Sequence, residues 1–212
     1  ETGEEGRQRQ RRLVGLSRSY GLRLIGPNCL GVINTDPAVS INASLSSVMP
    51  PRGRAGFFCQ SGALGSAILE KVQNRGLGLS TFVSAGNRAD VSGNDLLQYW
   101  EEDDSTEVVL LYLESIGNPR KFSRIAHRVS QRKPIIAVRS GRTTQGVPMG
   151  HAVRRIAAPP QAVDAMFRQA GIIQVDTLEE MFDVAQLVAH QPLPRGRRVA
   201  IVGNSDALGI GR

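Results

Sequence analysis

The stretch AGFFCQSGALG, residues 55–65, joins a short apolar run directly to a segment typical of a helix. The apolar run, residues 55–59, has the length of a buried strand and is too short for a buried helix. Gln60, Ser61 and Gly62 then supply the polar and small residues of a tight turn, in which the serine can cap the following helix. We therefore expect a strand, a turn and a helix here, which is one unit of an α/β fold.

The same alternation continues toward the C-terminus. Further strands are predicted at 79–84, 108–113, 135–138 and 172–175, and helices at 63–74, 94–101, 119–130, 161–170 and 178–189. Strands that read as continuous apolar runs are typical of a parallel sheet covered by helices on both faces. We predict an α/β fold with a flavodoxin-like, doubly wound parallel sheet over residues 55–192. In such sheets, ligands bind beyond the C-terminal ends of the strands.

Toward the N-terminus the pattern is different. A helix is predicted over residues 4–20, ended by Gly21, and a short strand over 22–25. Residues 35–54 contain three prolines and no clear period, which indicates a linker or crossover between two units. At the other end, a strand predicted at 199–202 places the start of a next subdomain in residues 193–212.

The composition excludes several classes of protein. The chain of 212 residues carries a net charge of +7, but the basic residues are scattered and only 5% of residues are aromatic. A nucleic-acid surface would show a basic stripe with interleaved aromatic residues, so the charge fits polyphosphate ligands better. No apolar run reaches the roughly 20 residues that would span a membrane. The two cysteines form no disulfide framework and suggest buried thiols in a reducing, cytoplasmic setting. Because cysteines and histidines do not cluster, no metal site is predicted.

The turn at Ser61, Gly62 and Ala63 is the first candidate site. Small residues at a helix N-terminus allow a phosphate to approach free backbone N–H groups. The alternative is a tight turn with a serine cap and no ligand. A Walker loop is excluded because its Lys-Ser/Thr ending is absent. A hydrolase elbow is disfavoured because Cys59 replaces its first glycine.

Three further candidates follow predicted strands. Residues 84–90 form either a ligand loop or a polar turn. Glu114 ends the strand 108–113, where it either faces the functional edge of the sheet or caps the next segment in solvent. His151 lies in a loop of about 20 residues, and loops of that length in compact domains are usually functional or disordered. A lone histidine is more often structural, so the loop is what favours a function for it.

Five motifs occur in one order along the chain. They are GPNCLGVI at 26–33, SGAL at 61–64, FVSAGNRAD at 82–90, LYLES at 111–115 and MGHA at 149–152. In this order they resemble the family of NDP-forming acyl-CoA synthetases, which includes succinyl-CoA synthetase and ADP-forming acetyl-CoA synthetase. The resemblance covers nearly the whole chain, and five motifs together are far more specific than any one.

The resemblance implies a role for each candidate. His151 would carry a phosphoryl group between an acyl phosphate and a nucleoside diphosphate, and Glu114 would orient its imidazole. The overall reaction would be acyl-CoA + phosphate + NDP to acid + CoA + NTP, reversible, with CoA and Mg²⁺-bound ATP or ADP. Ser61, Gly62 and Ala63 would bind the phosphoryl oxygens, whereas the substrate and CoA side would be formed by Asn28, Cys29, Gly86 and Asn87.

The resemblance also implies missing partners. Residues 1–34 would be the end of a CoA-binding Rossmann domain, and an ATP-grasp domain or subunit would have to act with this chain, as part of an oligomer or a fused assembly. We therefore expect the fragment to be inactive alone. Arg154 and Arg155 follow the histidine where the family more often has small residues. This departure motivates an alternative, a non-catalytic sensing domain for acyl-CoA or nucleotide in a protein fused to a Gcn5-type acetyltransferase. A third reading is a flavodoxin-like module for another ligand.

Overall fold

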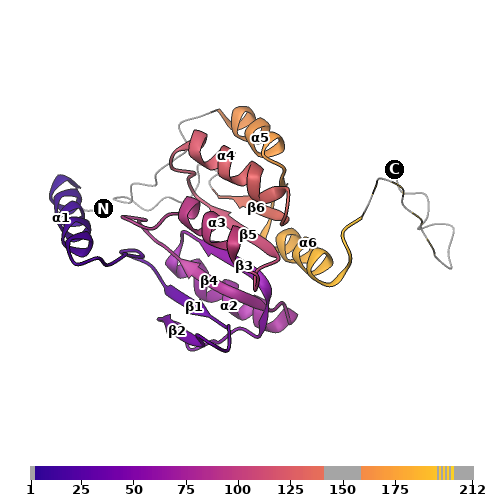
Figure 1. Ribbon diagram of the computed structural model, residues 1–212, viewed down its shortest axis with the longest axis horizontal. Helices are drawn as coiled ribbons and strands as arrows, with labels where there is room; N and C mark the ends of the chain where they lie inside the picture. Colours follow the sequence, from indigo (N-terminus) through magenta and orange to yellow (C-terminus); the bar gives the residue numbers. More distant parts are fainter. Residues whose placement is uncertain are drawn as a thin grey trace.

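The computed structural model describes residues 3–140 and 159–194, together with residues 196, 198, 200 and 202. Within them the strands form one seven-stranded sheet with the order β2-β1-β4-β3-β5-β6-β7 (Figure 1). The strands are β1 (Gly31–Asn34), β2 (Ile41–Ser44), β3 (Arg52–Cys59), β4 (Leu79–Ser84), β5 (Val108–Leu113), β6 (Ile135–Arg139) and β7 (Ile172–Val175). The helices are α1 (Gly3–Ser19), α2 (Gly62–Arg75), α3 (Gly93–Glu102), α4 (Pro119–Ser130), α5 (Pro160–Gln169) and α6 (Leu178–His190).

The strands from β3 to β7 are all parallel, and β3 lies inside the sheet between β4 and β5. Numbered from β3, their spatial order is 2-1-3-4-5, which is the flavodoxin-like order. The predicted flavodoxin-like, doubly wound sheet is therefore confirmed. The direction of winding reverses between β3 and β5, and in this fold that switch point is where ligands bind.

Two apolar clusters cover the two faces of the sheet. On β5, Val109 and Leu111 belong to the cluster with α3, α4 and α5, whereas Val108 and Leu110 belong to the cluster with α2 and α6. Successive side chains of a strand point to opposite faces, so both faces of this strand are buried. This explains why the strands read as apolar runs with no polar alternation.

Most predicted elements of residues 55–190 are confirmed to within three residues. The strands at 79–84, 108–113 and 172–175 and the helix at 119–130 have the predicted bounds. Local capping explains part of this agreement. The Ser61 side chain accepts a hydrogen bond from the Leu64 N–H at the start of α2, and Gly76 ends that helix in the left-handed conformation.

The segment expected to be a linker, residues 35–54, contains β2 and the start of β3. The strand β1 pairs antiparallel with β4, with Gly31 opposite Ser84, and β2 pairs with the outer side of β1. The sheet is thus two strands wider than predicted. The prediction failed because β2 is an edge strand with mostly exposed side chains, and it therefore lacks an apolar run.

The strand predicted at 22–25 is absent. The Leu24 N–H donates to the Asp90 carboxylate and the Leu24 carbonyl accepts from the Val91 N–H, so this backbone bonds to a loop. The strand predicted at 199–202 falls largely outside the described residues.

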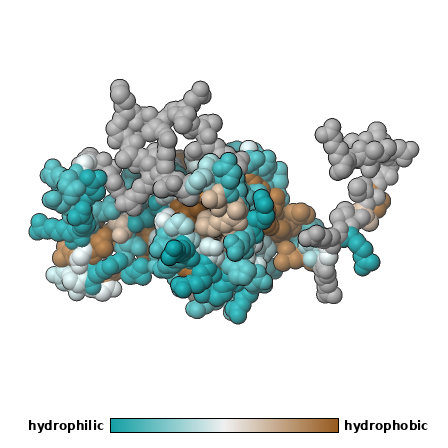
Figure 2. All heavy atoms as spheres, turned by 90° about the horizontal axis from the view of Figure 1, so that it is seen from above, coloured by the Kyte–Doolittle hydropathy of each residue, from teal (hydrophilic) through white to brown (hydrophobic). Residues whose placement is uncertain are grey.

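The helix predicted at 4–20 is confirmed as α1, which lies to one side of the layers in Figure 1 and has no buried residue. Its predicted apolar face, Leu13, Leu16 and Tyr20, is exposed. Figure 2 shows apolar surface on the side of α1 and again around α6, where Leu187 is exposed. Among the described helices, none is both long and apolar enough to cross a membrane.

Candidate functional site

Loops from β3, β4 and β5 meet at the edge of the sheet formed by the C-terminal ends of its parallel strands, here called the C-terminal edge. They are residues 60–61, 85–92 and 114–118, and the segment 26–30 lies against them. This edge includes the switch point between β3 and β5. The fold therefore brings together four segments that the sequence analysis had singled out separately.

The first of these loops leads into α2. Ser61 is extended, with φ −95° and ψ 124°, and its hydroxyl caps the helix. The first turn of α2 contains no acidic residue. Its free N–H groups and the helix dipole favour an anion, and no carboxylate of that turn competes for them. A Cβ atom on Gly62 would lie 3.5 Å from the Leu30 nitrogen, so the segment 26–30 passes directly beside this helix N-terminus.

The loop after β4 is bound to the same segment by backbone hydrogen bonds. The Asn87 N–H donates to the Pro27 carbonyl and the Ala89 N–H donates to the Gly26 carbonyl, each at 2.9 Å. Gly86 has φ +49°, and a Cβ there would collide with the carbonyl oxygens of residues 27 and 28. The four residues predicted for the substrate and CoA side are consequently neighbours: Asn28, Cys29, Gly86 and Asn87.

Asp90 fixes this loop to the chain that precedes β1. Its carboxylate side chain is 1% exposed and accepts hydrogen bonds from Arg18, Arg23 and the Leu24 N–H. The bonds from Arg23 and then Arg18 hold the pKa of Asp90 well below its usual range. Sequence reasoning placed Asp90 in a motif but gave it no role, because its partners lie 66 to 72 residues away in the chain.

Glu114 follows the last residue of β5 and is half-buried. Its negative charge acts on Cys59 and Tyr112, which lie on the side of the sheet covered by α2 and α6. The Glu114 N–H also donates to the Gln60 side chain at 2.8 Å, so the backbone of Glu114 lies close to the residue that precedes the cap of α2. The pKa of the Cys59 thiol is raised to about 12, mainly by burial and further by the Glu114 charge. Burial also raises the pKa of Tyr112.

Both thiols were predicted to be buried. This prediction is confirmed for Cys59 and wrong for Cys29, which is only partly buried. Partial burial still raises the pKa of the Cys29 thiol. Both thiols are therefore protonated at neutral pH, and neither is a ready nucleophile.

His151 lies outside the described residues. The chain that leads toward it leaves β6 beside Glu114, because the Ser140 N–H donates to the Leu113 carbonyl at 2.9 Å. The guanidinium of Arg139, the last residue of β6, lies 3.5 Å from the Pro160 carbonyl oxygen. Residues on both sides of the gap in the described chain are thus neighbours at this edge of the sheet.

Three side chains to which the sequence analysis gave no individual role connect the loops. Gln60 hydrogen-bonds the backbone of Glu114 and Ser115, and Arg88 donates to both the carbonyl and the hydroxyl of Ser115. Gln60 and Ser115 are buried. Gln60 was named as a turn residue and Ser115 lies in the motif at 111–115, but no local signal gave either side chain a partner.

Comparison with known proteins identifies the class to which this fold and site belong. Residues 52–188 match the family model described as the succinyl-CoA ligase like flavodoxin domain. Because the match covers more than half of the chain, the chain belongs to this family.

The more specific resemblance is to ADP-forming ligases. The chain is 39% identical over 211 residues to acetate–CoA ligase [ADP-forming] I of Archaeoglobus fulgidus, covering 99% of this chain and 30% of that protein. It is 36% identical to the alpha subunit of acetate–CoA ligase [ADP-forming] II of Pyrococcus furiosus, covering 99% of this chain and 45% of that subunit. The chain therefore spans less than half the length of these relatives.

Solved structures agree with the sequence comparison. The acetyl-coenzyme A synthetase 1 of Candidatus Korarchaeum cryptofilum, in complex with phosphate and ADP, superposes with a TM-score of 0.80 at 36% identity. That match covers 88% of this chain and 40% of the other. A crystal structure of a protein from Pyrococcus horikoshii OT3 gives a TM-score of 0.83 at 37% identity, covering 99% and 43%. These similarities favour the ligase interpretation over the sensing domain of an acetyltransferase fusion.

Proposed function

We propose that this chain is the phosphohistidine-carrying part of an ADP-forming acyl-CoA synthetase. The observation that carries the proposal is the hydrogen bond from the Glu114 N–H to Gln60, the residue that precedes the cap of α2, at the switch point of a succinyl-CoA ligase like domain. The reaction would be acyl-CoA + phosphate + ADP to acid + CoA + ATP, in either direction. The names of the relatives point to acetate or another small acid as the acyl group.

His151 and Glu114 would share the phosphoryl transfer. An imidazole nitrogen attacks the phosphorus of the acyl phosphate, a P–N bond forms, and the P–O bond to the acyl group breaks to release the carboxylate. An oxygen of ADP then attacks the same phosphorus and the P–N bond breaks. The Glu114 carboxylate accepts the N–H of the other ring nitrogen, which keeps the attacking nitrogen unprotonated and nucleophilic.

The N-terminus of α2 would stabilise the phosphoryl group in this transfer. The backbone N–H groups near Gly62 and Ala63, together with the helix dipole, suit three negatively charged oxygens. The Ser61 hydroxyl accepts the Leu64 N–H at 3.3 Å, and it keeps its own O–H to donate to a phosphoryl oxygen.

Asn28, Cys29, Gly86 and Asn87 would face the CoA thioester. The absence of a side chain at Gly86 permits the close backbone contact that holds residues 26–30 against this loop. The Cys29 thiol is protonated and partly buried, so it would line the site and would not act as a nucleophile. Mg²⁺ would arrive with the nucleotide.

The other partners would be a CoA-binding domain and an ATP-grasp domain or subunit. In this proposal residues 1–34 end the CoA-binding domain, with β1 at their end joining the sheet, and residues 55–192 are the flavodoxin-like domain, in a cytoplasmic enzyme. The exposed apolar face of α1 supports the first assignment, because Leu13, Leu16 and Tyr20 have no covering layer among the described residues. By itself this chain should bind no more than part of the substrates and should not turn over.

Phosphorylation of the full-length protein tests the proposal. With labelled ATP and Mg²⁺, we expect an acid-labile, base-stable label that the substitution His151→Ala abolishes without loss of folding. His127→Ala, which changes an exposed histidine of α4, is the matched control and should keep the label. Label that persists in His151→Ala, or wild-type protein that stays unlabelled while it binds acyl-CoA, would refute the assignment.

Glu114→Gln separates the orienting role from the carrier role. We expect the rate of labelling to fall by about 100-fold, because the uncharged amide stabilises the developing imidazolium less well. The melting temperature should stay within a few degrees of wild type. An unchanged rate would remove Glu114 from the mechanism.

A further inference from the structure

At the end of β5, the side chain of Gln60 makes hydrogen bonds to the backbone that a neighbouring strand would normally make. In the last β3–β5 pair, Cys59 lies opposite Tyr112. Beyond it, β3 leaves the sheet to enter α2, so the N–H groups of Glu114 and Ser115 lose their neighbouring backbone. The amide oxygen of Gln60 accepts both N–H groups, at 2.8 and 2.9 Å. The amide nitrogen of Gln60 donates to the Ser115 carbonyl at 2.7 Å.

These three bonds require the chemistry of a primary amide. The group carries a donor and an acceptor, as a peptide unit does, and its side chain is long enough to span two strands. Gln60 is 5% exposed and Ser115 is 6% exposed, so solvent cannot easily replace the lost partners. A glutamate would keep the acceptor and lose the donor, whereas a methionine would keep the volume and lose both.

The position of Gln60 in the chain gives these bonds a consequence. Gln60 directly precedes Ser61, the cap of α2, and it binds the backbone of Glu114 itself. Beyond the last β3–β5 pair, the Gln60 side chain therefore links the residue before the helix cap directly to the carboxylate-bearing residue. Arg88 lies in the loop after β4, which also contains Gly86. It bonds this loop to Ser115, donating to the Ser115 carbonyl at 3.1 Å and to its hydroxyl at 2.5 Å.

We propose that Gln60 is a positioning residue that holds Glu114 at its working distance from the N-terminus of α2, with Arg88 and Ser115 joining the loop of Gly86 to the same point. This inference rests on the proposed function for its catalytic consequence. Gln60 itself touches no reacting atom in this scheme. A displacement of about 1 Å of a catalytic group can cost about 100-fold in rate, so the bonds of Gln60 control transfer without taking part in it.

A graded series in the full-length protein tests this inference. We expect the maximal rate of phosphoenzyme formation from ATP to fall by about 100-fold in Gln60→Met and by about 10-fold in Gln60→Glu. The KM for ATP should stay within about twofold, because the nucleotide is bound elsewhere. Gln73→Met, at an exposed position of α2, is the matched control and should behave as wild type. If Gln60→Met does not fold, the rate of phosphoenzyme formation in Gln60→Glu tests the inference by itself, because this variant keeps two of the three bonds.

Hydrogen exchange measured on the same proteins distinguishes the two proposals. Deuterium uptake of the peptide 113–117 should rise in Gln60→Met, since two amides lose their acceptor. Unchanged uptake in a folded Gln60→Met protein, or an unchanged maximal rate in either folded variant, overturns the inference. Wild-type protein that is never phosphorylated removes the proposed function and the catalytic consequence with it, while the uptake still shows whether Gln60 holds the Glu114 backbone.

Discussion

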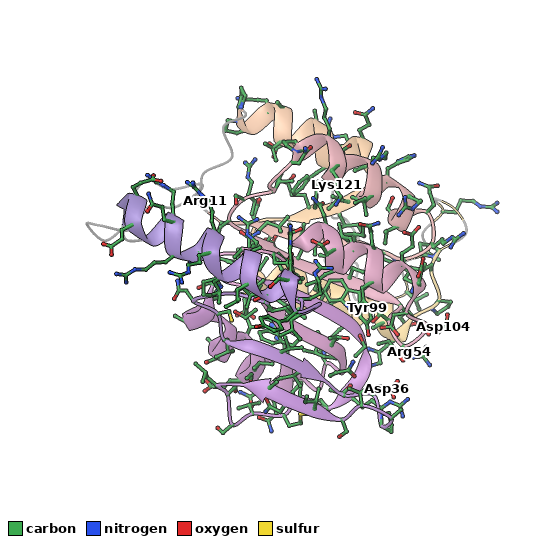
Figure 3. All side chains as sticks on the ribbon, turned by 60° about the vertical axis from the view of Figure 1, so that its left-hand side comes forward. Arg11, Asp36, Arg54, Tyr99, Asp104 and Lys121 are labelled. Atoms are coloured by element: carbon green, nitrogen blue, oxygen red, sulfur yellow. The ribbon has the colours of Figure 1, made fainter. Side chains whose placement is uncertain are left out.

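The sheet differs between the edge formed by the C-terminal ends of its parallel strands and the edge formed by their N-terminal ends. At the C-terminal edge, buried polar side chains join loops from separate parts of the chain, as Gln60 and Asp90 do. At the opposite edge, Arg54 and Glu107 form an ion pair whose side chains are 63% and 53% exposed, beside a hollow of about 560 Å³. Figure 3 shows Arg54 and Asp104 close together at this second edge, with Lys121 well away from them. The opposite edge also has buried polar bonds, such as the one between the Ser80 and Thr106 hydroxyls at 2.6 Å, but its Arg54–Glu107 ion pair is exposed, whereas the Asp90 carboxylate and Gln60 are buried.

Gly86→Ala should break the C-terminal edge most severely. An alanine there must adopt a positive φ and also displaces two backbone carbonyls, so we expect a loss of about 3 kcal/mol in the free energy of unfolding. Gly76→Ala is the matched control, because Gly76 also has positive φ but has open space around it. It should lose only about 1 kcal/mol. Urea unfolding of both variants measures the difference, and equal losses would show that the contact with residues 27 and 28 is unimportant.

Asp90→Asn should have the next largest effect, a loss of about 2 kcal/mol at pH 7. The bound arginines are exposed, which keeps the loss below that of a fully buried pair. The folded-state pKa of Asp90 lies below the unfolded value of about 3.9, so its contribution is present above that pH and declines as the pH falls further. The difference between wild type and variant, followed by urea unfolding, should therefore shrink below about pH 4. A difference that grows on acidification would contradict this account.

Arg54→Ala at the opposite edge should have the smallest effect. An exposed ion pair contributes little, and we expect the free energy of unfolding to change by less than about 0.5 kcal/mol. The same urea experiment at low and moderate salt checks this expectation. A loss as large as that of Asp90→Asn would remove the contrast between the two edges.

The sequence by itself determined the order of strands and helices in residues 55–190 and the candidate turn at Ser61. These follow from local signals, namely apolar runs of strand length, periodic helix faces and capping residues, which act within a few positions of one another. The motifs also indicated the residues around Gly86 and Glu114 before their arrangement was known.

Only the tertiary structure decided how those pieces join. The hairpin of β1 and β2 joins the sheet by pairing β1 with β4, and no alternation of apolar residues predicted it. The backbone near Leu24 bonds to a loop and not to a strand. The roles of Gln60 and Asp90 depend on partners 54 to 72 residues away. A hydrogen bond between such distant residues exists only after the chain has folded, so it leaves no periodic signal in the sequence.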